Sequence, residues 1–242
     1  MDPQAMGSDF RFKQFVVRQE GAAMKVGTDG VLLGAWAPLE GKPQAVLDIG
    51  AGTGLVALML AQRSQAERID ALEIDTGAFE TCVGNFEASP WADRLFCYHA
   101  GLQEFAEEFG PEYDLIVSNP PFHRETVSSG KPARDQARQQ SALPFEVLLG
   151  CAARLLTPEG RLCVIIPFRG EEDFLKQAGR FGLFPARITR VRGNPGSELK
   201  RSLLELSFHP HAPQQDELVV EQQRHRYTEA YRELTRDFYL RG

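Results

Sequence analysis

The residues that follow the apolar stretch 114–118 could activate an amino nitrogen, and they are Asn119, Pro120, Pro121 and Phe122. A planar amino nitrogen is a poor nucleophile, because its lone pair is delocalised into a ring or a carbonyl. Two acceptors that hold its hydrogens would let it become pyramidal. The side-chain oxygen of Asn119 can be one, and the carbonyl of Pro120, whose φ is fixed, can be the other. Phe122 offers a flat face for stacking a base, although a strand followed by a plain proline turn has the same pattern.

A glycine-rich turn lies upstream, between two apolar runs. Its glycines allow φ above zero and let a ligand approach the backbone closely, and they are Gly50, Gly52 and Gly54. The nicotinamide fingerprint has glycine at the first, third and sixth positions of such a turn, whereas the sixth position here is Leu55. The spacing resembles the nucleoside-binding turn of S-adenosylmethionine-dependent methyltransferases. We therefore expect the cofactor S-adenosyl-L-methionine to contact these three glycines and Ala51.

Acidic residues flank the glycine turn where a nucleoside site needs them. Residues 69–74 are predicted to form the second strand, and a carboxylate roughly 20 residues past such a turn can accept hydrogen bonds from ribose hydroxyls. Glu73 has this predicted role. Asp75 is predicted to cap the next helix, and Asp48 to anchor the turn or to reach the amino-acid end of the cofactor through water. The glycine turn, the acid and the Asn-Pro-Pro-Phe run together indicate a methyltransferase that acts on nitrogen.

Length and composition are typical of one globular α/β domain. The chain has 242 residues, of which 43% are hydrophobic and 25% charged. No apolar run approaches the ~20 residues of a membrane span, so we expect no membrane partner. The cysteines show neither metal spacing nor a disulfide framework, which favours reduced thiols in a cytoplasmic protein without a metal. These cysteines are Cys82, Cys97, Cys151 and Cys163. We also expect a monomer.

The charge of the chain is distributed unevenly. The net charge of −6, from 27 Lys and Arg against 33 Asp and Glu, argues against a protein that coats nucleic acid nonspecifically. A basic cluster nevertheless follows residues 119–122, the predicted catalytic run. It lies within an aperiodic stretch, 123–143, that we interpret as a mobile substrate loop. Any one of these basic residues alone is more often solvated surface. As a group, the predicted RNA-binding residues are Arg124, Lys131, Arg134, Arg138, Lys200 and Arg201.

Strand-like and helix-like segments alternate along the chain, which predicts a doubly wound, Rossmann-like sheet that is mainly parallel. The ligand of such a sheet binds at the carboxyl ends of its strands, where both motifs fall. Seven strands are expected, near residues 45–49, 69–74, 95–98, 114–118, 161–166, 186–192 and 203–208. Helices are expected near residues 28–37, 54–63, 76–87, 103–108, 145–156 and 171–181, with Thr28 or Asp29 as the cap of the first.

A single domain is expected to span residues 10–242 and to include the carboxyl-terminal tail. Residues 1–9 are interpreted as an unstructured start or a cloning remnant. An extended segment or hairpin is expected at 10–20, within an amino-terminal cover segment at 10–40. Apolar residues of the tail recur at helical spacing and are predicted to pack on the core, and they are Tyr231, Leu234 and Phe238.

Segments far apart in the sequence resemble one known family. They are residues 12–15, 24–36, 114–122, 134–138 and 227–239. The family is that of the bacterial tRNA adenine-N6 methyltransferases, which use S-adenosylmethionine to modify adenine 37, next to the anticodon of a valine tRNA. The resemblance covers essentially the whole chain after Asp9. It implies the class I methyltransferase fold, a tRNA partner, and methylation of N6 by the catalytic run 119–122.

The resemblance also implies how the cofactor is held. Lys25 and Thr28 belong to a segment that folds over its methionine moiety, and Asn119 lies against its methyl group. Relatives tend to carry an acid after the third strand for the cofactor adenine, but residues 99–102 of this chain are His-Ala-Gly-Leu. We therefore expect backbone groups near Leu102, or packing, to hold the adenine. Many relatives have tyrosine where this chain has Phe122, which keeps the stacking face and loses a hydroxyl.

Three alternative functions remain open. Guanine-N2 methyltransferases of ribosomal RNA share the catalytic run. Glutamine-N5 methyltransferases of release factors share it too, but they carry a separate amino-terminal helical domain, and only about 40 residues precede the core here. A non-catalytic RNA-binding module on the same scaffold would not require Asn119. Analogy of fold cannot choose among these substrates.

Overall fold

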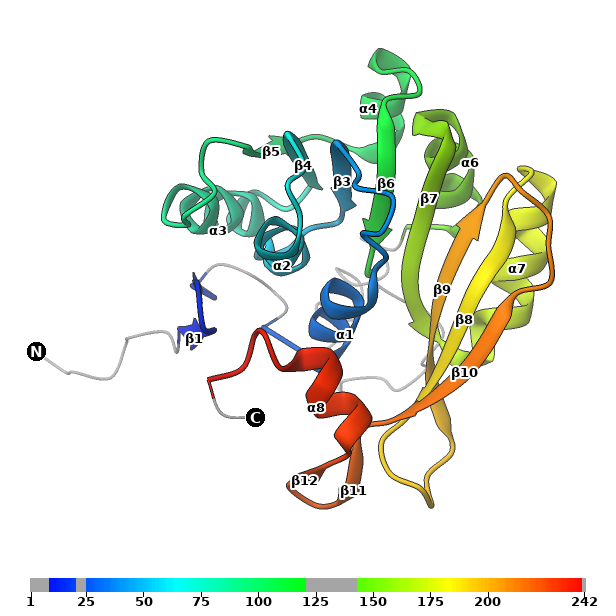
Figure 1. Cartoon of the computed structure of the whole chain (residues 1–242). Helices are drawn as coiled ribbons and strands as arrows, with labels where there is room; N and C mark the ends of the chain where they lie inside the picture. Colours follow the sequence, from blue (N-terminus) through cyan, green and yellow to red (C-terminus); the bar gives the residue numbers. More distant parts are fainter. Residues whose placement is uncertain (1–8, 21–24, 121–142, 241–242) are drawn as a thin grey trace, which may run out of the picture.

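An eight-stranded β-sheet with helices on both faces forms the centre of the protein (Figure 1). This computed structural model describes residues 9–20, 25–120 and 143–240. The strands of the sheet are β3 (Ala45–Ile49), β4 (Arg68–Glu73), β5 (Leu95–His99), β6 (Tyr113–Ser118), β7 (Leu156–Pro167), β8 (Phe184–Arg192), β9 (Leu199–Ser207) and β10 (Gln214–Val219). They lie in the order β10-β8-β9-β7-β6-β3-β4-β5.

Most strands of the sheet run parallel to their neighbours. The series β7, β6, β3, β4 and β5 is parallel throughout. Strand β9 is antiparallel to both β7 and β8, and β10 is parallel to β8. The central strands β3 and β6 are apolar runs buried along almost their whole length, as a parallel sheet covered on both faces requires. The predicted doubly wound, mainly parallel sheet is therefore confirmed.

The predicted number of seven strands is wrong, because β10 extends the sheet beyond β8. The residues of β10 are mostly polar, and among them Leu218 alone is buried. An edge strand of this composition has no apolar alternation, so hydrophobic periodicity carries no signal for it. The seven expected strands all occur, with shifted ends.

Helices on the two faces of the sheet enclose two apolar cores. The helices are α1 (Thr28–Trp36), α2 (Leu55–Arg63), α3 (Thr76–Glu87), α4 (Leu102–Glu108), α6 (Phe145–Leu155), α7 (Glu171–Arg180) and α8 (Glu229–Thr235). One core includes α1, α2 and α8, with Val46 and Val117 from the sheet; the other includes α4, α6 and α7, with Leu47 and Ile116. Neighbouring residues of one strand thus enter opposite cores, as the pleat requires.

A short hairpin lies near the start of the described chain, and its strands are β1 (Phe10–Arg11) and β2 (Val16–Val17). Phe12 and Phe15, in the turn of this hairpin, are buried in the core that contains α1 and α2. Lys13 donates its backbone N–H to the carbonyl of Phe238 at 2.8 Å, so the hairpin lies against the carboxyl-terminal tail. The expected hairpin is confirmed, and it shares a core with the sheet.

The carboxyl-terminal tail packs as its apolar spacing predicts. Tyr231 and Phe238 are 3% and 1% exposed, and Leu234 is half-buried against the same core. Between β10 and α8 the chain forms a second small hairpin, with strands β11 (Glu221–Gln223) and β12 (Arg226–Tyr227). In Figure 1 this hairpin lies beside α8, at the end of the molecule toward which β7 points.

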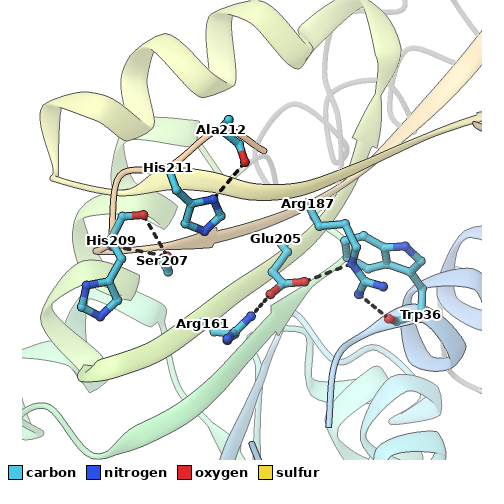
Figure 2. A network of polar contacts seen from close by, with 8 residues as sticks. All are labelled: Trp36, Arg161, Arg187, Glu205, Ser207, His209, His211 and Ala212. Carbon is cyan, nitrogen blue, oxygen red and sulfur yellow. Dashed lines mark hydrogen bonds and ion pairs between the residues drawn. The ribbon is translucent and has the colours of Figure 1, made fainter. Parts of the chain in front are cut away.

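A buried ion-pair network holds the carboxyl end of α1 on strands β8 and β9 (Figure 2). The carboxylate of Glu205, which is 3% exposed, accepts a hydrogen bond from Arg187 Nε at 3.1 Å and also pairs with Arg161. The guanidinium carbon of Arg187 lies 3.8 Å from the centre of the Trp36 ring, and the same group donates to the Trp36 carbonyl at 2.8 Å. Two guanidinium groups therefore compensate the buried carboxylate. These contacts set the orientation of α1.

The start of α1 differs from the prediction. Neither Thr28 nor Asp29 caps the helix, because Gly27 occupies the N-cap position and no side chain caps it. Asp29 instead accepts a hydrogen bond from Arg201 Nε of β9 at 2.8 Å. This carboxylate therefore forms an ion pair with a guanidinium from a remote part of the sequence, and does not accept a backbone N–H of its own helix.

Candidate active site

The carboxyl ends of the parallel strands bring the predicted motifs to one edge of the sheet. Ile49, at the end of β3, pairs with Ser118 of β6 and Leu72 of β4. The hydroxyl of Ser118 donates to the carbonyl of Ile49 at 2.9 Å, and the N–H of Ala51 donates to the carbonyl of Leu72 at 3.0 Å. The glycine turn after β3, Glu73 at the end of β4 and the predicted catalytic run after β6 therefore share one edge, where ligands of doubly wound sheets bind.

Two of the three turn glycines are open to a ligand, and the third is needed for packing. All three have left-handed φ values, of +72° at Gly50, +57° at Gly52 and +79° at Gly54. A Cβ added to Gly50 or Gly52 would meet no atom within 4 Å, so a ligand can approach the backbone there. A Cβ added to Gly54 would lie 2.5 Å from the ring of Phe86 and 2.9 Å from Cys82 Sγ. The turn thus packs tightly against α3 through Gly54.

The carboxylate of Glu73 lies directly against the glycine turn. Its Oε2 accepts the N–H of Gly52 at 2.8 Å, and its Oε1 accepts those of Ile74 and Asp75 at 2.8 and 2.9 Å. A carboxylate has about four lone-pair sites, so roughly one remains for a ligand hydroxyl unless a backbone bond is exchanged. Asp75 caps α3, as predicted, by accepting the N–H of Ala78 at 2.9 Å. The ribose role of Glu73 stays a prediction that its position supports.

Asp48 holds the glycine turn from inside the protein. Its side chain is 1% exposed, and its Oδ2 accepts the N–H of Ala57, in the first turn of α2, at 3.1 Å. Burial raises the pKa of Asp48 to about 7; the hydrogen bond from Ala57 lowers this pKa, and the charge of Glu73 raises it. Of the two predicted roles, these contacts fit the anchor, because they join β3 to α2 across the turn.

The region around β5 offers an apolar surface near the predicted adenine position. Leu102, the first residue of α4, is buried. The ring of His99 stacks on Phe79 with 5.0 Å between centroids, and its Nε2 lies 3.0 Å from the carbonyl of Ile74. The side chain of Ile74 is 68% exposed and directly follows Glu73. Sequence reasoning missed Ile74, although an apolar residue directly after the strand-ending acid was a usable signal.

A buried amide joins the amino-terminal segment to the glycine turn. Asn85 of α3 is 1% exposed, and its Nδ2 donates to the carbonyls of Thr53 at 2.9 Å and Arg18 at 3.0 Å. Its Oδ1 accepts the N–H of Arg18 at 2.9 Å. Asn85 is not among the residues predicted from the sequence, although a polar residue on the buried face of a helix was a usable signal. One side chain therefore couples the cover segment to the turn.

The start of α1 lies beside the glycine turn, where the cover segment was expected. A Cβ added to Gly30 would lie 3.1 Å from Leu55, the first residue of α2, so the two helices meet closely there. Lys25 and Thr28, the predicted cofactor contacts in this segment, are both exposed. Contact of either side chain with a cofactor stays a prediction.

The catalytic run starts at the end of β6, where Asn119 is half-buried and Pro120 is buried. Ser118, directly before them, is bonded to β3, so the backbone that carries the two predicted acceptors leaves the sheet from a fixed point. The other predicted catalytic residues, Pro121 and Phe122, lie outside the described residues, as do the predicted RNA contacts Arg124, Lys131, Arg134 and Arg138.

The two remaining predicted RNA contacts lie at the same edge, because the antiparallel strand β9 starts there. Arg201 is opposite Pro167, the last residue of β7. Its guanidinium forms the ion pair with Asp29, whereas Lys200 is exposed and pairs with no acid in the described part of the chain. An RNA role for either residue stays a prediction.

The described residues were also compared with what a metal site, a membrane span or a disulfide would require. Within residues 9–20, 25–120 and 143–240, no three His, Cys, Asp or Glu side chains gather as a metal site would require. None of the helices in those ranges is both long and apolar enough to cross a bilayer. All four cysteines are free, and burial raises the pKa of the Cys163 thiol.

Known proteins are similar to this chain over most of its length. The family described as methyltransferase small domain matches residues 31–180. A protein of Flavobacterium johnsoniae named tRNA1(Val) (adenine(37)-N6)-methyltransferase is 58% identical, over 96% of this chain and 99% of its own length. A protein of the same name from Pectobacterium carotovorum is 43% identical, over 96% and 93%. The crystal structure of a predicted O-methyltransferase of Agrobacterium tumefaciens, protein Atu636, has a TM-score of 0.66 and 19% identity, covering 87% of this chain and 96% of that one. This last likeness shows a shared fold alone.

Proposed function

The chain belongs to the family of the tRNA1(Val) (adenine(37)-N6)-methyltransferases, and from this premise we propose that it methylates N6 of adenine 37 in a valine tRNA. The observation that carries the proposal is the position of Asn119 and Pro120, which leave β6 at the sheet edge beside the glycine turn. Two acceptors next to a nucleoside site are what methyl transfer to an amino nitrogen requires. The enzyme is accordingly a tRNA (adenine-N6)-methyltransferase.

The residues of this edge fit S-adenosyl-L-methionine as the cofactor. Space beside Gly50 and Gly52 leaves their backbone open to a flat ligand. Glu73 keeps roughly one lone-pair site for a ribose hydroxyl. Ile74 supplies exposed apolar surface for the adenine, and backbone groups near Leu102 would hold it. When bound, this cofactor supplies a methyl group on a positively charged sulfur, which a neutral nitrogen can attack.

The residues of the chain prepare the nitrogen for that attack. The side-chain oxygen of Asn119 and the carbonyl of Pro120 accept hydrogen bonds from the two hydrogens of N6, which draws the lone pair out of the ring. Phe122 stacks against the base and keeps it in place. Much of the acceleration would come from positioning, because Asn119 and Pro120 would hold the nitrogen in one orientation. The cation formed is acidic and loses its proton to solvent, so no strong base is needed.

The anticodon loop of a tRNA suits this geometry. An adenine in an anticodon loop is unpaired and can be turned out of the stack at low cost. Basic residues beside the catalytic run, with Lys200 among them, would meet the phosphates of that loop. We assign residues 10–40 as a cover segment of one domain, 10–242, and 123–143 as its substrate loop. The β1–β2 hairpin and the carboxyl-terminal tail share a core with α1 and α2, which supports a single domain.

A tRNA substrate also favours a cytoplasmic location for the enzyme. We propose that the enzyme acts there as a monomer and without a metal ion. Gel filtration with light scattering, and activity in the presence of a chelator, test these two points. A dimer in solution, or loss of activity that added metal restores, would contradict them.

The proposed reaction is tested by incubating the protein with a labelled methyl donor and total tRNA, total ribosomal RNA or a release factor. Nucleoside analysis should find N6-methyladenosine in valine tRNA. A valine tRNA in which guanine replaces adenine 37 is the matched control and should stay unlabelled. Label on guanine N2 of ribosomal RNA, or on a glutamine of the release factor, would instead support one of the other nitrogen methyltransferases.

A further inference from the structure

The hairpin formed by β11 and β12 presents basic and aromatic side chains to solvent. Residues 222–227 are all exposed, and their sequence is Gln-Gln-Arg-His-Arg-Tyr. Arg224 and His225 connect the two strands, because Gln223 pairs with Arg226 across the hairpin. Neither Arg224 nor Arg226 has an acidic partner among the described residues. These two guanidinium groups are therefore available to an anionic partner.

Neighbouring arginines are in a different situation, since acids of the protein already neutralise them. Arg192 at the end of β8 pairs with Glu217 of β10 at 2.6 Å. Arg232 of α8 pairs with Glu229 at 2.6 Å. Glu217 and Glu229 are thus already paired, and the hairpin itself holds one acid, Glu221, against the two free arginines. Residues 221–227 therefore have a net positive charge, although the chain as a whole carries a net charge of −6.

An aromatic stack supports the base of the hairpin. The ring of Tyr227, which is 46% exposed, stacks on Tyr231 with 5.0 Å between centroids and 29° between planes. Tyr231 is buried, and its hydroxyl lies 3.2 Å from that of Tyr239. The exposed ring is therefore held by a fixed base. Aromatic rings held in this way are platforms on which single-stranded nucleic acids stack their bases.

The turn of the hairpin is held in an uncommon backbone conformation. His225 has φ of +61°, in the left-handed region, which few non-glycine residues adopt and in which asparagine, aspartate and histidine are enriched. The N–H of His225 donates to the side chain of Glu221 at 3.3 Å, which stabilises the turn. Non-glycine residues kept in this conformation are concentrated at functional sites. The turn fixes the adjacent arginines on an ordered scaffold.

The hairpin lies at the same edge of the sheet as the catalytic run. Val219, the last residue of β10, is opposite Arg192, as is Leu199 at the start of β9. Arg201 of β9 is in turn opposite Pro167, at the carboxyl end of β7. From β10 to β6 the sheet has four strand intervals, which is roughly 19 Å at about 4.8 Å each. Figure 1 shows the hairpin projecting beyond this edge, below α8.

From these features we infer that the β11–β12 hairpin is an RNA contact of this enzyme. Arg224 and Arg226 bind phosphates of the anticodon arm, and the ring of Tyr227 stacks on an unpaired base. Free arginines, a supported aromatic ring and a position at the catalytic edge fit RNA, because RNA offers phosphates and splayed bases together. The inference rests on the proposed function and adds a second contact, several strands away from Asn119.

The test measures binding of valine tRNA at several salt concentrations, alongside methylation. Arg224→Ala/Arg226→Ala should flatten the slope of log affinity against log salt by up to ~2 units, since each phosphate contact contributes about one. Tyr227→Ala should weaken binding by roughly 5- to 150-fold, whereas Tyr227→Phe, which keeps the ring, should stay close to wild type. At saturating tRNA the methylation rate should change by less than about twofold, because the hairpin supplies uniform binding.

Two controls separate a local contact from general effects. Arg154→Ala/Arg180→Ala removes the same charge at the opposite edge of the sheet, just before β7 and β8 begin, and should keep the wild-type slope. Arg224→Lys/Arg226→Lys keeps the charge and should keep the slope as well. Unchanged melting temperatures confirm that the variants fold.

The outcomes distinguish this inference from the proposed function. If Arg224→Ala/Arg226→Ala binds tRNA with the wild-type affinity and slope, the hairpin is solvated surface and the inference fails, while methylation by the wild type still supports the function. The inference also fails if the control at the opposite edge loses as much affinity. A wild-type protein that neither binds nor methylates tRNA would overturn both.

Discussion

Replacing Gly54 with alanine should destabilise the fold, because this glycine presses the cofactor turn against α3. The new Cβ would lie 2.5 Å from the ring of Phe86 and 2.9 Å from Cys82 Sγ, at a backbone φ of +79°. The left-handed conformation costs an alanine about 1–2 kcal/mol, and overpacking a core costs typically ~1–3 kcal/mol. Together they amount to roughly 2–5 kcal/mol, which for a domain of this size lowers the melting temperature by roughly 4–20 °C.

Thermal unfolding followed by circular dichroism, without cofactor, measures this effect. Gly84→Ala is the matched control: Gly84 lies in α3 between the same two side chains, and its added Cβ would meet no atom within 4 Å. This variant should be more stable by roughly 0.5–1 kcal/mol, because alanine suits a helix interior better than glycine. Adding Phe86→Leu to Gly54→Ala should recover part of the loss, since the two sites are in contact. A Gly54→Ala protein that melts within about 2 °C of wild type would refute the packing argument.

Three further predictions concern cofactor binding, catalysis and pH. Gly52→Val should abolish most of the rise in melting temperature that S-adenosylmethionine or its demethylated product produces by mass action, because its side chain occupies the open face of the turn. Asn119→Ala should keep this rise but lower the methylation rate by roughly 10²-fold or more, the scale of losing one transition-state acceptor. Burial raises the pKa of Asp48 from 3.8 to about 7, so the wild type should lose stability relative to Asp48→Asn as pH rises from about 4 to about 7. The asparagine keeps an acceptor for Ala57, and the stability difference between the two proteins should change by up to about 4 kcal/mol over this pH range.

Each of these three predictions has an outcome that contradicts it. Stabilisation by NAD and not by the methyl donor would remove the assignment of the glycine turn. Unchanged turnover in Asn119→Ala would exclude the acceptor role. A stability difference between wild type and Asp48→Asn that stays constant from pH 4 to pH 8 would show that Asp48 is ionised in the folded protein at low pH.

Most elements of this fold follow from local sequence. The apolar runs at 45–49 and 114–118 are long enough to be buried on both faces, and they occur as β3 and β6. Glycine spacing places the turn after β3, and Asp75 caps α3 through a bond to a residue three positions on. Properties that depend on neighbours along the chain are visible in a single sequence. Strand β10 is not visible in this way, because its polar residues form a strand only through pairing with β8.

The catalytic run, the turn and the acid could likewise be identified from residue types and spacing. That they meet at one edge follows from the rule that ligands of doubly wound sheets bind at the carboxyl ends of parallel strands. The register confirms this arrangement, with Ile49 between Leu72 and Ser118. The sequence alone therefore determined the class of fold and the edge of the sheet at which the glycine turn, Glu73 and Asn119 meet; their roles in binding and catalysis stay predictions.

Tertiary structure decided which partner each polar side chain has. Asp29 is a suitable helix cap by type, but it pairs with Arg201, 172 positions away. Asn85 appears in sequence as one polar residue among several in its helix, yet it is buried and joins the cover segment to the glycine turn. The arginines of the carboxyl-terminal part look alike in sequence, and only the fold separates those that acids neutralise from those of the β11–β12 hairpin. The physical reason is that hydrogen bonds and ion pairs act over a few ångströms in space, and periodicity along the chain carries no information about which distant groups approach so closely.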